Sequence, residues 1–138
     1  MILYDYFRST ASYRVRLALA IKGLDYEARE VHLVNNGGEQ HADAFRALNA
    51  QGRVPVLVDG EVTISQSLAI ISYLSAQYPD STPLLFGTPE LQAHMRMIAL
   101  AVACDIHPLN NLSVLQYLKN ELKVTDEQKT AWYHHWIK

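Results

Sequence analysis

A chain of 138 residues is long enough to bury a hydrophobic core, and its length alone suggests one domain. Fourteen acidic residues against twelve Lys and Arg give a net charge of −2, which excludes an overall basic field for nucleic acid. A charged fraction of 19% with 49% hydrophobic residues is typical of a soluble globular protein. The single cysteine, Cys104, excludes an internal disulfide and suits a reducing compartment.

The first residues show no signal-peptide pattern, and the last residues stop inside an expected helix. The stretch MILYDYF starts at once with a strand pattern and lacks the basic and long apolar segments of a signal peptide. No apolar run reaches the roughly 18 residues of a membrane span. We therefore expect a cytoplasmic protein with no membrane partner. The end KTAWYHHWIK stops inside an expected amphipathic helix without a cap, and we expect it to belong to a longer chain.

The first elements in chain order are a strand, a helix and a second strand. Residues 2–6 (ILYDY) favour a short strand, and residues 12–22 favour a helix that Gly23 ends. Residues 26–33 suit a second strand, although apolar and polar residues alternate less cleanly there. A polar, glycine-containing loop then leads into a short helix, in the stretch VNNGGEQHADAFRALN.

A hairpin and another helix complete the first 80 residues. VPVLVDGEVTIS contains two β-branched runs that turn at Asp59-Gly60. From Ser65 onward, apolar residues follow helical spacing until Pro79 ends the helix. The order of strands and helices predicts a mixed four-stranded sheet with helices packed against it.

The remaining sequence is a linker followed by helices. Residues 81–89 are rich in proline and glycine, and we interpret them as a linker between an N-terminal domain at 1–80 and a helical domain at 90–138. Residues 90–122 are almost wholly helical in pattern, and residues 126–138 begin another helix. We expect this second domain to be incomplete.

Small hydroxyls and cations surround the start of the first helix, in YFRSTASYRVRLALAIKGL. Free N–H groups and the positive end of the dipole stabilise an anion at such a position. Ser and Thr are also favoured helix caps, so capping alone is the alternative interpretation. Four cations lie in this stretch with no acidic residue among them, and their charge favours an anionic ligand: Arg8, Arg14, Arg16 and Lys22. Arg14 and Arg16 lie two apart on a helix, so we expect at least one to serve structure or face solvent.

Two further motifs lie in the first 80 residues. Pro55 in RVPVL fits either a plain strand-starting proline or a fixed turn of the backbone. Gln66-Ser67 opens the helix after the hairpin, and a serine at a helix start either binds an anion or caps the helix. Arg53 either pairs with a ligand carboxylate or is solvated.

The helical half contains one polar cluster. Pro108 in CDIHPLNNLSVL is expected to kink its helix, and four polar residues surround it: Asp105, His107, Asn110 and Asn111. No third and fourth ligand at suitable spacing appears, so we predict no metal site. Cys104 is expected to be a small buried hydrophobe. We expect His134 and His135 on a helix surface.

The motifs together resemble the cytosolic glutathione transferases, and more narrowly the zeta class, the maleylacetoacetate isomerase family. The resemblance rests on four ordered motifs that span nearly the whole chain: YFRSTASYRVRLALAIKGL, VPVLVDG, ISQSLAIISYL and CDIHPLNNLSVLQYL. It implies an α+β thioredoxin-like N-terminal domain followed by an all-α C-terminal domain. It also implies glutathione as cofactor and a homodimer.

The resemblance implies a role for each motif. Ser9 would activate the glutathione thiol with support from Thr10, and Arg8 would face the diacid substrate. A cis Val54-Pro55 bond would present the Val54 backbone to the tripeptide, and Gln66-Ser67 would hold its γ-glutamyl carboxylate. Residues from the helical half would approach glutathione across the dimer interface. The implied glutathione-binding residues are Ser9, Thr10, Ala11, Ser12, Tyr13, Arg14, Gln40, Arg53, Val54, Pro55, Gln66, Ser67, His107, Asn111, Leu112 and Ser113.

Ala11 departs from the family, which commonly has cysteine at this position. Glutathione must therefore supply the sulfur. The implied reaction adds the thiolate to the cis double bond of maleylacetoacetate, lets the resulting single bond rotate, and eliminates the thiolate to leave fumarylacetoacetate. This reaction belongs to tyrosine and phenylalanine catabolism.

Three alternatives remain open. A maleylpyruvate isomerase would share fold, cofactor and mechanism, but members of that branch can carry arginine where this chain has Leu112-Ser113. A general glutathione transferase or peroxidase would act on halo-acids or peroxides. A non-catalytic scaffold is the third, and the joint presence of Ser9, Val54-Pro55 and Gln66-Ser67 argues against it.

Overall fold

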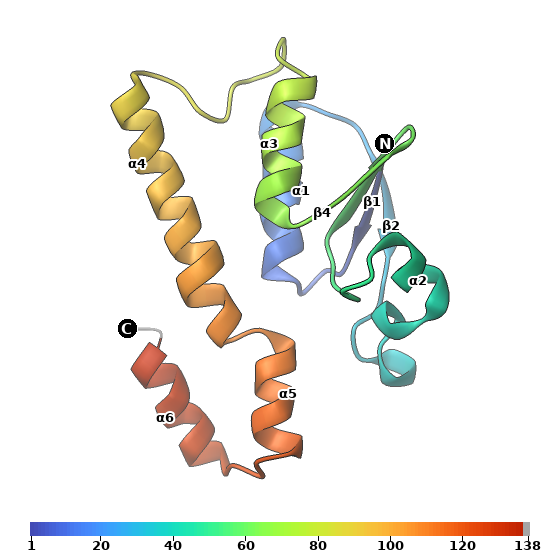
Figure 1. Cartoon of the computed structure of the whole chain (residues 1–138), viewed down its shortest axis with the longest axis vertical. Coiled ribbons are helices and arrows are strands. Elements are labelled where there is room, and N and C mark those ends of the chain that lie inside the picture. The colour runs from blue at the N-terminus through green and yellow to red at the C-terminus, as the bar shows by residue number, and fades with distance from the viewer. Residues whose placement is uncertain (137–138) are drawn as a thin grey trace. The chain divides into compact units, whose positions relative to one another are not determined.

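The computed structural model describes residues 1–136, apart from the side chain at position 36. The chain separates into two compact units, Met1–Phe86 and Gly87–Lys138, and each is described by itself. The first unit combines a sheet with helices, and the second is helical (Figure 1). The thioredoxin-like sheet unit and the helical region predicted from the sequence are both present.

The sheet of the first unit has four strands in the order β2-β1-β3-β4. β1 (Ile2–Asp5) pairs in parallel with β2 (Glu27–Glu30) and antiparallel with β3 (Val56–Asp59), which pairs antiparallel with β4 (Val62–Ser65). This confirms the predicted mixed sheet and its hairpin. β2 is shorter than the predicted 26–33, and all four of its residues are exposed.

The two faces of the sheet carry separate apolar clusters because side chains alternate along each strand. Leu3 and Leu57 point to one face, where α1 (Thr10–Lys22) and α3 (Ser67–Gln77) pack side by side (Figure 1). These contacts fully bury Val15 and Leu19 of α1 and Ile70 and Leu74 of α3.

On the other face, α2 (Asp43–Leu48) packs Phe45 against a cluster that includes Tyr6, Val31, Val54 and Val56. Both faces are therefore covered, which holds the strand ends in place.

The first helix ends as the sequence predicts. Gly23 adopts the left-handed conformation at φ 66°, and Leu24 N–H bonds to the Leu19 carbonyl at 3.0 Å. Lys22 is buried, and its ammonium donates to the carbonyls of Tyr78 (3.2 Å) and Thr82 (3.3 Å). Lys22 thus ties the end of α1 to the chain that follows α3, and it is not one of the cations available to a substrate.

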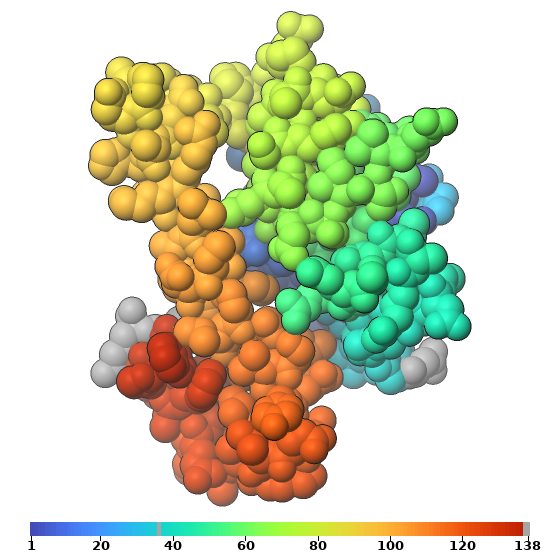
Figure 2. All heavy atoms as spheres, viewed as in Figure 1, coloured from blue at the N-terminus to red at the C-terminus, as the bar shows by residue number. Residues whose placement is uncertain are grey.

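The segment between β2 and α2 contains two short 3-10 turns, Asn35–Gly37 and Glu39–His41. It approaches the chain at Gly52 so closely that a Cβ there would lie 2.9 Å from the Gln40 carbonyl oxygen. Gly52 also has a φ of 59°, which favours glycine. Glycine at this position therefore lets the Gln40 segment pack against the loop that leads to Val54. In Figure 2, the surface of the first unit runs from the light-green atoms of α3 to the teal atoms around α2.

The second unit is a chain of helices interrupted where the sequence predicts. α4 (Pro89–Leu100) continues into a π turn (Ala101–Ile106) and a 3-10 turn (His107–Leu109) before α5 (Leu112–Asn120) begins. This break confirms the predicted effect of Pro108. α6 (Asp126–Trp136) follows, and the end of the predicted 126–138 helix lies outside the described residues. The Trp132 indole N–H bonds to the Leu109 carbonyl at 2.8 Å and links α6 to the break.

Two expectations for this unit need correction, and one is confirmed. Cys104 is exposed in the π turn rather than buried. By length and composition alone, the helical segment 89–120 is long and apolar enough to cross a membrane, contrary to the expectation from apolar runs. Polar residues interrupt the apolar runs of this segment, but its mean hydropathy is high enough for a membrane span. The core helix of a soluble protein can meet the same criterion. His134 and His135 lie on an exposed helix surface, as predicted.

Candidate functional site

Ser9 lies between the end of β1 and the first turn of α1. Its amide donates to the Tyr6 carbonyl at 2.8 Å, and its hydroxyl oxygen accepts from the Ser12 amide at 3.2 Å. Ser9 is therefore the N-cap of α1, as one interpretation predicts. A capping oxygen is an acceptor, so the hydroxyl hydrogen remains able to donate to a ligand. Capping and thiol activation are compatible in this geometry.

The residues around Ser9 differ in exposure. Arg8, Thr10 and Tyr13 are exposed, and Ala11 is half-buried. Ser12 is fully buried, and its hydroxyl oxygen has no hydrogen-bond partner among the described residues. The accessible polar groups at this helix start are therefore those of Arg8, Ser9, Thr10 and Tyr13.

Arg14 and Arg16 leave α1 in different directions. Arg14 Nε donates to the Ser67 hydroxyl oxygen at 3.0 Å, which joins the start of α1 to the start of α3. Arg16 pairs with Asp5 at the end of β1, with its Nη1 2.5 Å from Oδ2. Arg16 thus serves structure, in agreement with the expectation that at least one of the two arginines serves structure or faces solvent. Sequence reasoning missed both partners, because they lie 53 and 11 residues away.

The start of α3 is open, meaning that no side chain caps it, and its backbone is strained at Gln66. Gln66 precedes the helix with a φ of 72° and a ψ of 115°, and its side chain makes no cap bond. The Gln66 side-chain Nε2 instead donates to the Gln51 side-chain oxygen at 3.0 Å. Ser67 is buried, and because Arg14 donates to its oxygen, its hydroxyl hydrogen is free for an acceptor. Uncapped N–H groups, a hydroxyl donor and a nearby guanidinium suit a carboxylate. Strain of this kind collects at functional sites.

The Val54-Pro55 peptide bond is cis, as the resemblance implies. The pairing of β3 with β1 and β4 begins at Val56, so the Val54 amide and carbonyl lie outside the sheet ladder. The preceding turn is held by Asn49, whose side-chain amide donates to the Arg53 carbonyl at 2.7 Å. The Arg53 side chain is exposed. Backbone groups next to a strand but outside its ladder can pair with an extended peptide.

Gln40 carries a second buried polar atom without a partner. Its Nε2 lies 3.4 Å from the Leu33 carbonyl and 3.1 Å from His41 Nε2, while Oε1 has no hydrogen-bond partner among the described residues. A buried amide oxygen in this state is costly unless a ligand or water donates to it. Together, the hydrogen-bond donors and acceptors described in the first unit fit a small peptide with carboxylates.

In the polar cluster of the second unit, the side chain of Asn111 is hydrogen-bonded to neighbouring residues of the same segment. Asn111 caps α5: its Oδ1 accepts from the Val114 amide (3.1 Å) and the Ser113 hydroxyl (2.6 Å), and its Nδ2 donates to the Pro108 carbonyl (2.9 Å). Leu112 is 37% exposed, and His107 is half-buried. No group of three or more potential metal ligands occurs in residues 1–136.

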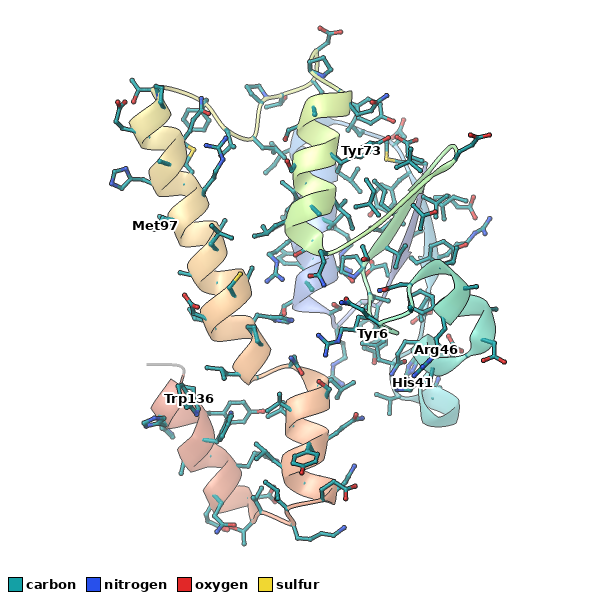
Figure 3. The ribbon with its side chains drawn as sticks, in the orientation of Figure 1. Tyr6, His41, Arg46, Tyr73, Met97 and Trp136 are labelled. Atoms are coloured by element: carbon teal, nitrogen blue, oxygen red, sulfur yellow. The ribbon has the colours of Figure 1, made fainter. Side chains whose placement is uncertain are left out.

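A separate polar cluster lies on the hairpin. Asp59 accepts hydrogen bonds from the hydroxyls of Tyr73 (3.0 Å) and Tyr78 (2.6 Å). The bond to Asp59, followed by burial, raises the pKa of Tyr78 to about 12. Burial and then the same carboxylate raise the pKa of Tyr73, which is labelled on α3 in Figure 3. The hydroxyls of both tyrosines therefore have a structural role, because they attach α3 and the residue that ends it to the hairpin.

Comparison with known proteins places this geometry in context. Residues 3–82 match the family model described as the N-terminal domain of glutathione S-transferase. The chain is 54% identical over 99% of its length to the probable maleylacetoacetate isomerase of Vibrio cholerae. It is 50% identical over 99% of its length to the maleylacetoacetate isomerase of Pseudomonas aeruginosa. The chain spans 63% and 64% of these two relatives.

Solved structures agree. A holo maleylpyruvate isomerase of the zeta class superposes with a TM-score of 0.92 and 42% identity, over 99% of this chain and 63% of that one. A maleylacetoacetate isomerase from Methylobacterium extorquens AM1, with bound malonate and glutathione, gives a TM-score of 0.88 and 38% identity, over 96% and 61%. The zeta-class resemblance seen in the sequence is confirmed by these likenesses.

Proposed function

Because the chain belongs to the glutathione S-transferase family, we propose that the protein binds glutathione and isomerises maleylacetoacetate to fumarylacetoacetate. The observation that carries the proposal is the Arg14–Ser67 bond of 3.0 Å. This bond holds the open start of α3 beside the helix that Ser9 begins. One unit of the chain therefore offers a hydroxyl donor for a sulfur and an anion site for a carboxylate. Two curated relatives with 54% and 50% identity carry the name of this activity.

Ser9 is the residue proposed to act on the thiol. Its hydroxyl donates a hydrogen bond that stabilises a thiolate over a neutral thiol, and so lowers the thiol pKa. The first turn of α1 adds N–H groups and the positive end of its dipole. Thr10 supports this position as the first residue of α1.

The tripeptide is held by three groups of the first unit. The amide and carbonyl of Val54 pair with its backbone, and Ser67 with the uncapped start of α3 receives the γ-glutamyl carboxylate. Gln40 serves the glycyl end, where its unpartnered Oε1 accepts from the peptide N–H. The resemblance adds Ala11, Ser12, Tyr13, Arg14, Arg53, Pro55 and Gln66 to this set, and His107, Asn111, Leu112 and Ser113 from the second unit.

The chemistry requires a nucleophile that this chain does not contain at the site. Ala11 supplies no sulfur. Glutathione, when bound, supplies the thiolate that adds to the cis double bond, permits rotation and then leaves. Arg8 is exposed beside Ser9 and is proposed to orient a carboxylate of the substrate by charge.

We extend the proposal to the setting of the enzyme. We propose that it is a homodimer in the cytoplasm, without a membrane partner, and that it acts in tyrosine and phenylalanine breakdown, as the family resemblance implies. The apolar segment 89–120 contains Asp105, His107 and a π turn, which suit a helix covered by protein better than one in lipid. Sedimentation of the full-length protein tests the dimer, and a monomer would remove the cross-interface role of His107.

A maleylpyruvate isomerase is the second candidate. Its specific support is the TM-score of 0.92 with a holo enzyme of that name. Leu112 and Ser113 favour maleylacetoacetate, since members of the other branch can carry arginine there.

Coupled assays with both maleyl substrates, at equal glutathione concentration, test the proposed function. We expect glutathione-dependent conversion of maleylacetoacetate at a higher kcat/KM than maleylpyruvate. The reverse preference would establish the second candidate. Inactivity on both substrates together with retention on immobilised glutathione would indicate a general transferase, and no retention would indicate a scaffold.

A further inference from the structure

Arg16 reaches from the second turn of α1 to the end of β1. Its Nη1 lies 2.7 Å from Asp5 Oδ1 and 2.5 Å from Oδ2. The two side chains are 24% and 12% exposed, so water screens this pair less than a surface pair. Asp5 neutralises the guanidinium, which therefore does not serve as a free anion-binding charge.

The same guanidinium also holds the loop between β1 and α1. Nη1 approaches the Tyr6 carbonyl at 3.4 Å, and Nη2 donates to the Phe7 carbonyl at 3.2 Å. The Tyr6 carbonyl is the acceptor for the Ser9 amide, at 2.8 Å. One carbonyl thus connects Arg16 directly to the backbone of Ser9. Tyr6 is labelled at this loop in Figure 3.

A second Arg–carboxylate pair in the same unit shows what this arrangement adds. Arg29 pairs with Glu27 at 2.7 Å on the edge strand β2, where the side chains are 48% and 57% exposed. That pair lies within one strand, and Arg29 also donates to the Tyr4 hydroxyl of β1 at 3.2 Å, but neither contact touches the loop before Ser9. Arg16 instead joins a helix, the end of a strand and two carbonyls of the loop before Ser9. Its contacts concentrate on the segment that sets where the Ser9 hydroxyl lies.

We infer that Arg16, anchored by Asp5, is a positioning residue that fixes Ser9 for thiol activation. This inference rests on the proposed function. A hydrogen bond to sulfur depends on the placement of its donor, and a shift of about 1 Å at a reacting group can cost about a hundredfold in rate. Arg16 acts through the Tyr6 and Phe7 carbonyls and does not touch the ligand.

The test uses Arg16→Lys and Asp5→Asn in the full chain, with Arg29→Met as the matched control. Lysine keeps the charge but cannot reach both carboxylate oxygens and both carbonyls as a fork does. The first readout is hydrogen exchange of the Ser9 amide without ligand. We expect exchange to be at least about tenfold faster in both Arg16→Lys and Asp5→Asn, since opening its bond to Tyr6 becomes easier, and unchanged in Arg29→Met.

The second readout is the pKa of bound glutathione, followed by thiolate absorbance, together with kcat and KM. We expect the thiol pKa to rise by about one unit, which means about tenfold less thiolate below that pKa. The expected kcat falls by a similar factor while KM for glutathione changes about twofold or less, because the groups that hold the tripeptide are untouched. A role in folding alone would lower stability without moving the thiol pKa.

The outcomes separate the two claims. A wild-type protein that binds no glutathione, or binds it without lowering its thiol pKa, would overturn the proposed function and this inference with it. A lowered thiol pKa that either folded variant retains, with normal Ser9 exchange, would overturn only the role of Arg16. If both variants fail to fold while Arg29→Met folds, the pair serves folding and the inference is overturned.

Discussion

The helix starts of the two units use polar side chains in opposite ways. In the first unit, the Ser67 hydroxyl at the start of α3 accepts from Arg14 and keeps its hydrogen for another partner, while Gln66 leaves the helix uncapped. In the second unit, the side-chain oxygen and nitrogen of Asn111 at the start of α5 make three hydrogen bonds to neighbouring residues of the chain. Both stretches look alike in sequence, as small polar residues before an apolar helix.

A polar cluster therefore indicates a ligand only where hydrogen-bonding capacity remains unused. Spare donors and a strained residue at the start of α3 cost stability unless a ligand compensates for them. A fully bonded cap at α5 stabilises the fold without any ligand. Substitutions at these helix starts therefore separate loss of binding from loss of stability.

The largest effect is expected at Ser9. Ser9→Gly removes the hydroxyl but keeps a residue that helix N-caps tolerate, so it costs only a few tenths of a kcal/mol in stability. We expect the isomerisation rate to fall by roughly a hundredfold, as for other lost donors to a developing anion. Steady-state rates and thermal unfolding measured on the same preparation check this, and an unchanged rate would refute the assigned role.

The next effect is expected at Ser67. Ser67→Ala removes a hydrogen bond to a carboxylate, and such bonds contribute about 1.5–3 kcal/mol. Calorimetry should therefore show glutathione affinity weakened by at least about tenfold. Thr88→Ala is the matched control, because the Thr88 hydroxyl caps α4 through the Leu91 amide and bonds Glu90 within the same helix turn. Equal losses of affinity in the two variants would contradict an anion site at α3.

A smaller effect, on stability, is expected at Asn111. Asn111→Ala should lower the free energy of unfolding by about 1 kcal/mol, since the cap of α5 is lost. Denaturant titration checks this value. Its effect on glutathione affinity should be smaller than that of Ser67→Ala. A larger one would show that the α5 start, despite its internal bonds, belongs to the binding site.

The smallest effect is expected at Gln66, and its sign is opposite. Gln66→Gly relieves a φ of 72°, worth about 1–3 kcal/mol, against an entropic cost of about 0.4–1 kcal/mol for glycine. The variant also loses the side-chain bond from Gln66 to Gln51, worth about 0.5–1.5 kcal/mol. We therefore expect a net gain in stability of about 0.5 kcal/mol together with weaker glutathione binding. Chemical denaturation and calorimetry measure the two changes, and a destabilised variant would show that the Gln66 side chain supports the fold.

Sequence patterns predicted the parts of the fold that depend on local residues. The turn at Asp59-Gly60, the left-handed Gly23 and the helix break at Pro108 follow from conformational preferences of single residues. The cis bond at Pro55 followed from family resemblance. All four are present in the structure.

Tertiary contacts decided the rest. The Arg14–Ser67 bond spans 53 residues, and no local pattern could pair them. The sequence places Lys22 among the cations available to a substrate, whereas its ammonium donates to the Tyr78 and Thr82 carbonyls. The conformation of Gln66 is imposed by its surroundings, because glutamine does not favour a positive φ.

The central claim is that the open start of α3 recognises the γ-glutamyl carboxylate of glutathione. The most direct measurement compares calorimetric affinities of the full-length protein for glutathione and for cysteinylglycine, which lacks that residue. We predict that cysteinylglycine binds at least about tenfold more weakly, as expected for loss of a charge-assisted hydrogen bond. Equal affinity for the two peptides, or no binding of glutathione, would contradict the account.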